Sequence, residues 1–192
     1  YKILIVDDVM SNVLLLKVLL TNEKFAIATA NNGRQALEQV DKEHPDLVLL
    51  DVMMPDLSGF EVAQRLKSNP DTADIPIIFL TALNSTTDIV KGFQAGASDF
   101  ISKPFNKEEL IIRVTHQVSL VAAKRIILNK TEELQRIIAG RDKLYSVIAH
   151  DLRSPMGSIK MVLNMLMLNL PVEKIGGEMY ELLTMANRTT ED

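Results

Sequence analysis

Hydrophobic and polar positions follow a repeating order along the first two-thirds of the chain. Five short runs rich in leucine, isoleucine and valine occur, and amphipathic segments with apolar residues three to four positions apart lie between them. The runs contain few polar residues, which is typical of strands buried on both faces of a parallel sheet. The predicted strands are 2–6, 25–30, 46–50, 75–80 and 98–101, and the predicted intervening helices are 11–20, 34–42, 60–67 and 86–94.

Strands that alternate with helices predict an α/β fold, in which right-handed crossovers cover both faces of one parallel sheet. We expect a doubly wound, flavodoxin-like (βα)5 sheet with the strand order 2-1-3-4-5. Ser11 is expected to cap the first helix, and the pair Asn32-Gly33 indicates a turn before the second helix.

The periodicity changes after Pro104. One long helical pattern starts at Asn106, the expected N-cap, and continues past Pro155 until positions 169–171 interrupt it. A second amphipathic stretch follows Gly176-Gly177. The later part of the long helix fits a heptad repeat and predicts a two-stranded coiled coil, which Gly140 and two polar seam residues weaken. The seam positions are Ile127, Thr131, Leu134, Ile138, Arg141, Tyr145, Ile148 and Leu152.

These patterns divide the chain into three predicted parts. Residues 1–121 form the α/β domain, residues 122–140 form a helical coiled-coil connector, and residues 141–192 form a helical hairpin. The chain begins at Tyr1, and its last amphipathic stretch reaches Asp192 without a stop signal. We therefore expect a fragment of a longer protein, with the hairpin truncated in its second helix.

Composition narrows the classes of function. The 192 residues carry a net charge of −4 without a cluster of Lys and Arg, so nucleic-acid binding is not expected. Cysteine is absent, which excludes disulfides and thiolate metal sites and suits a reducing cytoplasm, the expected location. No apolar run approaches the roughly 20 residues that span a bilayer, so we expect no membrane segment in this chain.

Five polar residues fall at the carboxyl ends of four predicted strands. Asp7 and Asp8 follow the first strand, Asp51 follows the third, Thr81 follows the fourth and Lys103 follows the fifth. The carboxyl ends of parallel strands meet at one edge of the sheet, where doubly wound folds bind their ligands. Each residue alone is ordinarily a turn or surface residue, but the combination of types at these positions predicts a functional site.

The chemistry of the predicted site follows from its charges. Clustered carboxylates repel one another, and a bound cation relieves this repulsion. Oxygen ligands without Cys or His favour a hard divalent ion, and we expect Mg²⁺. Asp51, the central carboxylate, is the candidate nucleophile, while Lys103 and Thr81 can bind oxygen atoms of a phosphoryl group.

Residues 1–121 resemble a response regulator receiver domain. The resemblance implies Mg²⁺-dependent phosphorylation of Asp51 by a phosphodonor kinase or phosphotransfer protein. It also implies that Asp8, Asp51 and the backbone carbonyl of Met53 bind the metal and that Asp7 assists, directly or through water. The motifs that carry the resemblance are Ile5-Val6-Asp7-Asp8, Leu49-Leu50-Asp51-Val52-Met53-Met54-Pro55-Asp56, Thr81-Ala82 and Lys103-Pro104-Phe105.

The same resemblance implies that Thr81 and Phe100 form a conformational switch. Because Phe100 has no hydroxyl group, only burial of its ring can operate there, and the alternative is that Phe100 is an ordinary core residue. The Lys103-Pro104 peptide is often cis in this family and could be cis in this chain.

A histidine in the second module is the other candidate for chemistry. On the heptad assignment His150 projects away from the seam, where a histidine is most often an incidental surface residue. Its neighbours favour a role, because Asp151 could take or hold an imidazole proton and Ser154 lies one turn further on the same face. Pro155 disturbs the helix one turn beyond the histidine. His44 and His116 lack metal-ligand spacing and are interpreted as incidental.

The segment from Ser146 to Pro155 resembles the H-box of histidine-kinase dimerisation and phosphoacceptor domains. The resemblance implies that two chains pair into a four-helix bundle, that His150 is the phosphoacceptor and that Asp151 is its acid–base partner. Relatives usually have Thr or Asn where this chain has Ser154, and that residue positions water for dephosphorylation. Ser154 keeps a hydroxyl group in an altered place, so phosphatase activity stays open.

The order of these modules predicts a fragment of a hybrid sensor histidine kinase. The chain has no glycine-rich phosphate loop, so use of ATP would require an ATP-binding domain of the parent protein. The alternative is a phosphorylation-dependent dimerisation switch in which His150 is a passive phosphotransfer station. A phosphatase of the haloacid dehalogenase type is a third possibility, but it expects a second Asp where this chain has Met53.

Overall fold

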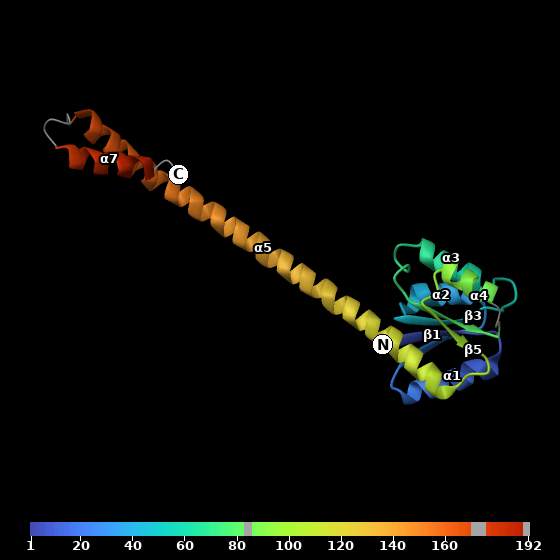
Figure 1. Cartoon of the computed structure of the whole chain (residues 1–192). Coiled ribbons are helices and arrows are strands. Elements are labelled where there is room, and N and C mark those ends of the chain that lie inside the picture. The colour runs from blue at the N-terminus through green and yellow to red at the C-terminus, as the bar shows by residue number, and fades with distance from the viewer. Residues whose placement is uncertain (83–85, 170–175, 190–192) are drawn as a thin grey trace. The chain divides into compact units, whose positions relative to one another are not determined.

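The computed structural model describes residues 1–82, 86–169 and 176–189. It contains two compact units, residues 1–127 and 128–192, and helix α5 (Lys107–Asn169) contributes to both (Figure 1). Within the described residues, no helix combines the length and apolar character needed to cross a membrane.

The first unit contains one five-stranded parallel sheet. Its strand order is β2-β1-β3-β4-β5, and every neighbouring pair is parallel, which confirms the predicted doubly wound α/β fold. The three central strands β1, β3 and β4 are short and almost entirely apolar, as the sequence predicts, whereas the edge strands β2 and β5 include polar residues. The strands are β1 (Lys2–Val6), β2 (Ala26–Ala30), β3 (Leu47–Asp51), β4 (Ile77–Thr81) and β5 (Asp99–Ser102).

Helices connect the strands and continue beyond the last one. Asn32 and Asn106 act as N-caps, because their side chains accept hydrogen bonds from Gln35 N and Glu109 N. The expected cap at Ser11 is wrong: α1 begins at Met10, so Ser11 lies inside the helix, and the N-cap residue Val9 has no capping side chain. The other helices are α1 (Met10–Asn22), α2 (Gly33–Glu43), α3 (Gly59–Ser68), α4 (Thr86–Gln94) and α7 (Gly177–Thr189).

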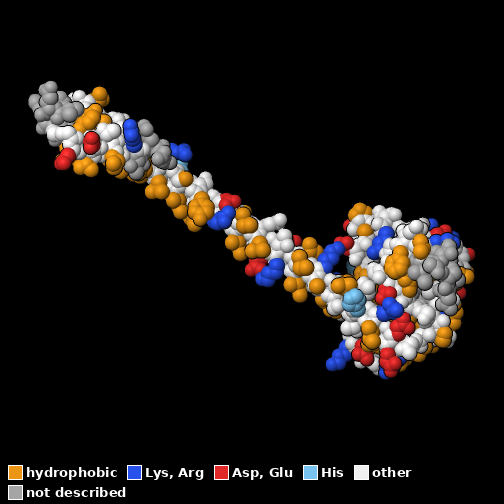
Figure 2. Space-filling view, viewed as in Figure 1, with side chains coloured by type: hydrophobic (Ala, Val, Ile, Leu, Met, Phe, Trp, Pro, Cys, Tyr) orange, Lys and Arg blue, Asp and Glu red, His pale blue; other side chains and the backbone are white. Residues whose placement is uncertain are grey.

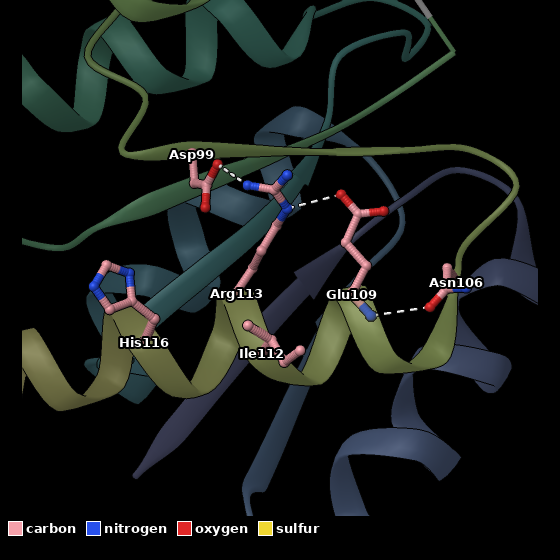
Figure 3. A pocket seen from close by; sticks show the side chains of 6 residues that line it. All are labelled: Asp99, Asn106, Glu109, Ile112, Arg113 and His116. Carbon is pink, nitrogen blue, oxygen red and sulfur yellow. Dashed lines mark hydrogen bonds and ion pairs between the residues drawn. The ribbon is translucent and has the colours of Figure 1, made fainter.

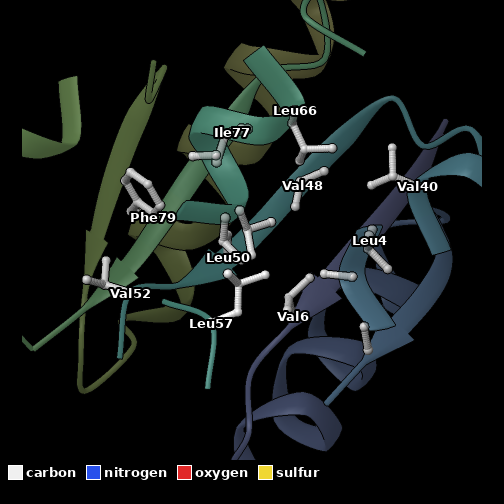
Figure 4. Close-up of a cluster of buried hydrophobic side chains, with 14 of the residues drawn as sticks. Leu4, Val6, Val40, Val48, Leu50, Val52, Leu57, Leu66, Ile77 and Phe79 are labelled. Atoms are coloured by element: carbon white, nitrogen blue, oxygen red, sulfur yellow. The ribbon is translucent and has the colours of Figure 1, made fainter. Parts of the chain in front are cut away.

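Two apolar layers hold the sheet between the helices. Alternate residues of β1 point to opposite faces, so Leu4 and Val6 join one layer while Ile3 and Ile5 join the other. Helices α2 and α3 cover the first layer, which Figure 4 shows, and α1 and the start of α5 cover the second. Burial on both faces explains why the central strands are almost continuously apolar.

A close approach fixes the segment that follows β3. Ser58 and Glu61 form a reciprocal capping box at the start of α3, and Gly59 N donates to Val52 O over 3.0 Å. A Cβ atom at Gly59 would lie only 2.2 Å from the carbonyl oxygen of Asp51 and 2.9 Å from Cα of Val52. The backbone of α3 therefore packs directly on the end of the strand that carries Asp51.

The second unit contains the distal part of α5 and helix α7. Helix α5 continues through Pro155 to Asn169, and its predicted seam residues are exposed in this single chain. Figure 2 shows hydrophobic side chains distributed along this part of the helix. Asn187 Nδ2 in α7 donates to Asn164 Oδ1 over 3.0 Å, so the two helices form a hairpin. The coiled coil and the four-helix bundle stay predictions, and positions 170 and 171 of the predicted break lie outside the described residues.

The packing at Gly59 generates a prediction about stability. Gly59→Ala should destabilise the first unit by about 1–3 kcal/mol, because backbone atoms that cannot move freely occupy the space of the new methyl group. Urea denaturation followed by circular dichroism would measure the change. Gly140→Ala is the matched control, since nothing lies within 4 Å of its Cβ position and Ala favours a helix by about 1 kcal/mol. Equal denaturation midpoints for Gly59→Ala and wild type would contradict the packing argument.

Candidate functional site

An acidic pocket lies at the carboxyl edge of the sheet. Asp7 and Asp8 follow β1, and Asp51 is the last residue of β3, which is the direct neighbour of β1. Each of these residues offers a carboxylate oxygen, and the three oxygens lie within 4.8 Å of one another. Asp7 and Asp51 are buried, whereas Asp8 is exposed. The pocket thus has two interior carboxylates and one that faces solvent.

Lys103 reaches this pocket from the loop after β5. Its Nζ lies 2.8 Å from Asp7 Oδ2 and 2.7 Å from Asp51 Oδ2, so one ammonium group bridges the two buried carboxylates. Its backbone N–H donates to Thr81 O over 2.8 Å, which ties the loop to the end of β4. The Lys103-Pro104 peptide is cis, in agreement with the expectation. The structure therefore brings together all five residues predicted from the strand ends.

Asp7 is held by donors that the sequence argument did not identify. Its Oδ1 accepts from Val9 N over 2.9 Å, and Asn12 Nδ2 lies 3.0 and 3.1 Å from its two oxygens. Asn12 was missed because it lies inside α1. The signal that could have found it is its spacing, since an amide five residues after a strand-end aspartate falls on the first turn of the following helix. Asp7 is thus fixed in place before any ligand binds.

Among the described residues, Asp51 has fewer hydrogen-bond partners than Asp7. Its Oδ1 accepts from Met53 N over 3.2 Å, and its Oδ2 bonds to Lys103. Burial raises the pKa of the Asp51 carboxyl above its ordinary value, and the opposing hydrogen bond and charge of Lys103 do not cancel this effect. Burial by itself would lower the pKa of Lys103, but its hydrogen bonds to Asp51 and Asp7 outweigh burial and raise it. Lys103 therefore stays protonated, and burial disfavours the charged form of the Asp51 carboxyl beside it.

The donor set fits a hard divalent cation. Three carboxylates and one ammonium leave the pocket with excess negative charge, and their oxygen atoms suit Mg²⁺. Asp8 and Asp51 are the residues that would bind the ion, and Met53 lies beside them through its backbone hydrogen bond to Asp51. Ligation by the Met53 carbonyl, and assistance from Asp7, stay predictions. When bound, Mg²⁺ would neutralise charge on a phosphoryl group.

Phe100 lies on the side of β5 that faces α4. Its ring packs against Phe79 at 5.8 Å and edge-on against Phe93 at 4.8 Å between ring centroids. A Cβ atom at Gly92 would lie 2.4 Å from the Phe100 ring, so the aromatic ring fills the space that this glycine leaves. Thr81 is buried at the end of β4, two residues after Phe79. Their role as a switch stays a prediction.

The predicted histidine site lies in the second unit, on α5. The His150 side chain is 83% exposed, and its Nδ1 lies 3.3 Å from Asp151 Oδ1. Ser154 is exposed on the next turn, and its carbonyl accepts from Ser158 Oγ over 3.2 Å. The structure thus pairs His150 with Asp151 and leaves the imidazole accessible. Phosphoacceptor and acid–base roles for these residues stay predictions.

A second, shallow pocket on β5 and α5 has none of the acidic pocket's residues in its lining. Arg113 lies at its centre and is paired on two sides, 2.7 Å from Asp99 Oδ1 and 2.8 Å from Glu109 Oε1 (Figure 3). These pairings satisfy its charge within the fold. His116 lines this pocket, and His44 caps α2 in a left-handed conformation. Among the described residues, the metal-suited group consists of Asp7, Asp8 and Asp51 and contains no histidine.

Comparison with known proteins identifies the family. Residues 3–115 match the family model of the response regulator receiver domain, which is more than half of the chain. The chain therefore belongs to the response regulator receiver family, and its first unit is a receiver domain of a two-component system.

The chain matches only part of the length of its curated relatives. The response regulator PleD of Caulobacter vibrioides is 42% identical over 140 residues, which are 73% of this chain and 30% of PleD. The DNA-binding response regulator MtrA of Mycobacterium leprae is 42% identical over 113 residues, which are 59% of this chain and 49% of MtrA. The chain thus spans half or less of these curated relatives.

Solved structures show the same fold. A putative response regulator from Chloroflexus aurantiacus matches with a TM-score of 0.60 and 34% identity, and the match covers 62% of this chain and 98% of that one. The signal receiver domain of a signal transduction histidine kinase from Syntrophus aciditrophicus matches with a TM-score of 0.58 and 36% identity, covering 62% of this chain and 89% of that one.

The burial of Asp51 generates a prediction about charge. Asp51→Asn should raise the thermal unfolding midpoint in buffer without divalent cations, because the substitution removes a buried negative charge that burial disfavours. Differential scanning calorimetry would measure the shift. Asp56→Asn makes the same change at an exposed residue with a positive φ of 66° that Asn tolerates, so it should give no comparable rise. A midpoint for Asp51→Asn at or below that of wild type would contradict the argument.

The pH dependence of this effect has a definite sign. Folded Asp51 keeps its proton to a higher pH than the unfolded residue, so its charge destabilises the fold only as the pH rises through the raised pKa. The advantage of Asp51→Asn should vanish toward the ordinary value of 3.8 and be complete above the raised pKa. Mg²⁺ needs the deprotonated carboxylate, so stabilisation of wild type by Mg²⁺ should weaken as the pH falls through the same window.

Proposed function

We propose that Asp51 accepts a phosphoryl group from a phosphodonor kinase or phosphotransfer protein in a reaction that requires Mg²⁺. An oxygen of the Asp51 carboxylate forms a bond to phosphorus, while the bond between phosphorus and the donor breaks and its electron pair leaves with the donor. The observation that carries this proposal is the buried Asp51 carboxylate, which Lys103 contacts at 2.7 Å inside a cluster of oxygen ligands suited to a cation.

The neighbouring residues have distinct roles in this proposal. Lys103 would remain at the site as a fixed positive charge and bind an oxygen of the phosphoryl group. Thr81, buried at the end of β4, would donate a hydrogen bond to another oxygen once the group is attached. Phe100, packed against Phe79 of the same sheet and Phe93 of α4, would follow the movement of Thr81 by a change in ring burial.

We further propose that the chain is part of a hybrid histidine kinase in which the receiver regulates phosphorylation of His150. The exposed His150 imidazole and the Asp151 carboxylate at 3.3 Å support a phosphoacceptor with an acid–base partner. The hairpin of α5 and α7 supports a four-helix bundle formed by two chains, in the reducing environment of the cytoplasm. An ATP-binding domain of the parent protein would supply the phosphoryl group.

The competing candidate is a receiver that acts as a phosphorylation-dependent dimerisation switch, with His150 as a passive phosphotransfer station. The relatives named response regulators favour this candidate, whereas the matching receiver from a signal transduction histidine kinase favours the first. The two differ in whether His150 is phosphorylated from ATP, so labelling of His150 decides between them.

Labelling of the receiver tests the first proposal. Incubation with radioactive acetyl phosphate and Mg²⁺ should label the wild-type chain with phosphate that is stable in acid and labile in alkali, as expected of an acyl phosphate. Asp51→Asn should abolish the label, and chelation of Mg²⁺ should do the same. The exposed control Asp56→Asn should keep it. Persistence of the alkali-labile label in Asp51→Asn would mean that another residue is the acceptor.

Labelling of the second unit tests the kinase proposal. A histidine-kinase ATP-binding domain is fused after Asp192, and the fusion protein is incubated with labelled ATP. The chain should then carry an acid-labile phosphate. His150→Gln should remove this label, because glutamine keeps the side chain polar without a nucleophilic nitrogen. His116→Gln, at an exposed histidine in the same helix, is the matched control and should keep it. No difference between the two variants would favour the dimerisation switch.

A further inference from the structure

Helix α5 stops contacting the hydrophobic core well before the first unit ends. Its buried residues are Leu110, Val114, Gln117 and Val118, and its side chains from residue 123 to residue 127 are exposed. The unit nevertheless extends to Ile127. Charged and aromatic contacts, rather than apolar burial, hold this last part of the helix against the receiver.

Arg125 makes the first of these contacts. Its guanidinium forms an ion pair with Asp46, whose side chain is only 12% exposed, and lies 5.7 Å from the centroid of the Tyr1 ring. Asp46 is itself fixed, because its Oδ2 accepts from Lys2 N over 2.7 Å and its own N–H donates to Lys2 O over 2.7 Å. Figure 1 places the N-terminus beside α5 in agreement with this contact. Arg125 therefore binds a rigid acceptor at the start of β3.

Lys124 makes the second contact. Its Nζ lies 2.6 Å from Asp74 Oδ1 in the segment before β4. This segment is firmly attached to α3, because Lys67 Nζ donates to the carbonyls of Ala73 and Ile75 at 2.8 and 2.7 Å. An exposed ion pair is weak by itself, but here it adds to the partly buried pair of the adjacent residue. The helix is thus fastened to the beginnings of two neighbouring strands.

These two strands are the ones that end at the phosphorylation site. β3 begins after Asp46 and ends at Asp51, and β4 begins after Asp74 and ends at Thr81. Both strands are fully buried and pair with each other, so each behaves as a short rigid bar between its two ends. A displacement of Asp51 or Thr81 at one end can therefore reach the helix at the other.

We propose that Lys124 and Arg125 form an ionic clamp that fixes α5 on the starts of β3 and β4 and carries the state of the phosphorylation site into the helix. The clamp itself exists without phosphorylation, whereas its signalling role rests on the proposed function of Asp51. The clamp lies at the edge of the sheet opposite the acidic pocket, and strands β3 and β4 connect the two.

The clamp is tested by a distance measurement across the end of the first unit. The chain lacks cysteine, so spin labels can be attached at Gln64→Cys on α3 and Asn129→Cys on α5, both exposed residues. Electron–electron double resonance, with excess unlabelled chain to suppress distances between chains, should give a narrow distribution. The double substitution Lys124→Gln and Arg125→Gln should broaden it, and high salt should broaden the distribution of the unsubstituted clamp.

Two further variants separate the clamp from a general effect of charge. Lys130→Gln removes a positive charge that pairs at 2.6 Å with Glu133 of the same helix, so the distribution should stay narrow. The double substitution Lys124→Glu with Asp74→Lys restores the ion pair with the two charges exchanged. Its distance distribution should therefore be narrower than that of Lys124→Glu alone. An unchanged distribution in the double substitution would overturn the clamp.

Phosphorylation then tests the signalling role. Acetyl phosphate and Mg²⁺ should shift the distance in the labelled chain, and the shift should be lost in the clamp variant although Asp51 still incorporates phosphate. The same shift in both chains, or no shift in the intact clamp despite incorporation, would overturn the route. Failure to incorporate phosphate at all would instead overturn the proposed function of Asp51, while the measurement without phosphate still decides whether the clamp exists.

Discussion

The buried carboxylates of Asp7 and Asp51 share the ammonium group of Lys103. The fold of the receiver brings these three residues together although they follow or end three different strands. Asp7 follows β1 and Asp51 ends the neighbouring strand β3, but Lys103 follows β5, with β4 between it and Asp51. Its long side chain must pass the end of β4, where Lys103 N donates a hydrogen bond to Thr81 O. The strand order is therefore a condition of the site, because it decides which side chains can meet.

Because two carboxylates share one ammonium group, the negative charge of the site is only partly compensated. Within the part of the chain that the structure describes, Asp7 accepts hydrogen bonds from Val9, Asn12 and Lys103, whereas Asp51 accepts them from Met53 N and Lys103. The less satisfied carboxylate is thus the one that gains most from a cation or a covalent partner. The rigid surroundings, including Gly59 packed on the backbone of Asp51, prevent the pocket from relaxing to remove the imbalance.

The sequence predicts the fold closely because the signals are local. Apolar runs define the strands, and Asn106 caps α5 where expected. The five site residues are found together because their positions at strand ends, not their exact contacts, determine where they meet. The failures have local causes as well: Ser11 has a capping residue type, but the chain enters α1 one residue before it, and Asn12 is hidden within a helical pattern.

Tertiary contacts account for what the sequence could not supply. The pairing of Arg125 with Asp46 joins residues that are far apart in the chain, and no local sequence pattern links them. The packing of Phe100 against Phe79 and Phe93 depends on the space left by Gly92, which no periodicity reveals. The seam on the distal part of α5 is visible in the sequence, and the pairing of two chains along it stays a prediction.

Besides its place in the sheet, β1 orients the side chain of Asp46 through a hydrogen bond from the backbone N–H of Lys2. Asp46 holds the N–H of Lys2 with one carboxylate oxygen and Arg125 with the other. A chain trimmed by its first two residues would keep most of its core but would lose the bond that orients this carboxylate. The segment formed by Tyr1 and Lys2 is therefore a structural support for α5, and its removal would loosen a junction more than a hundred residues further along the chain.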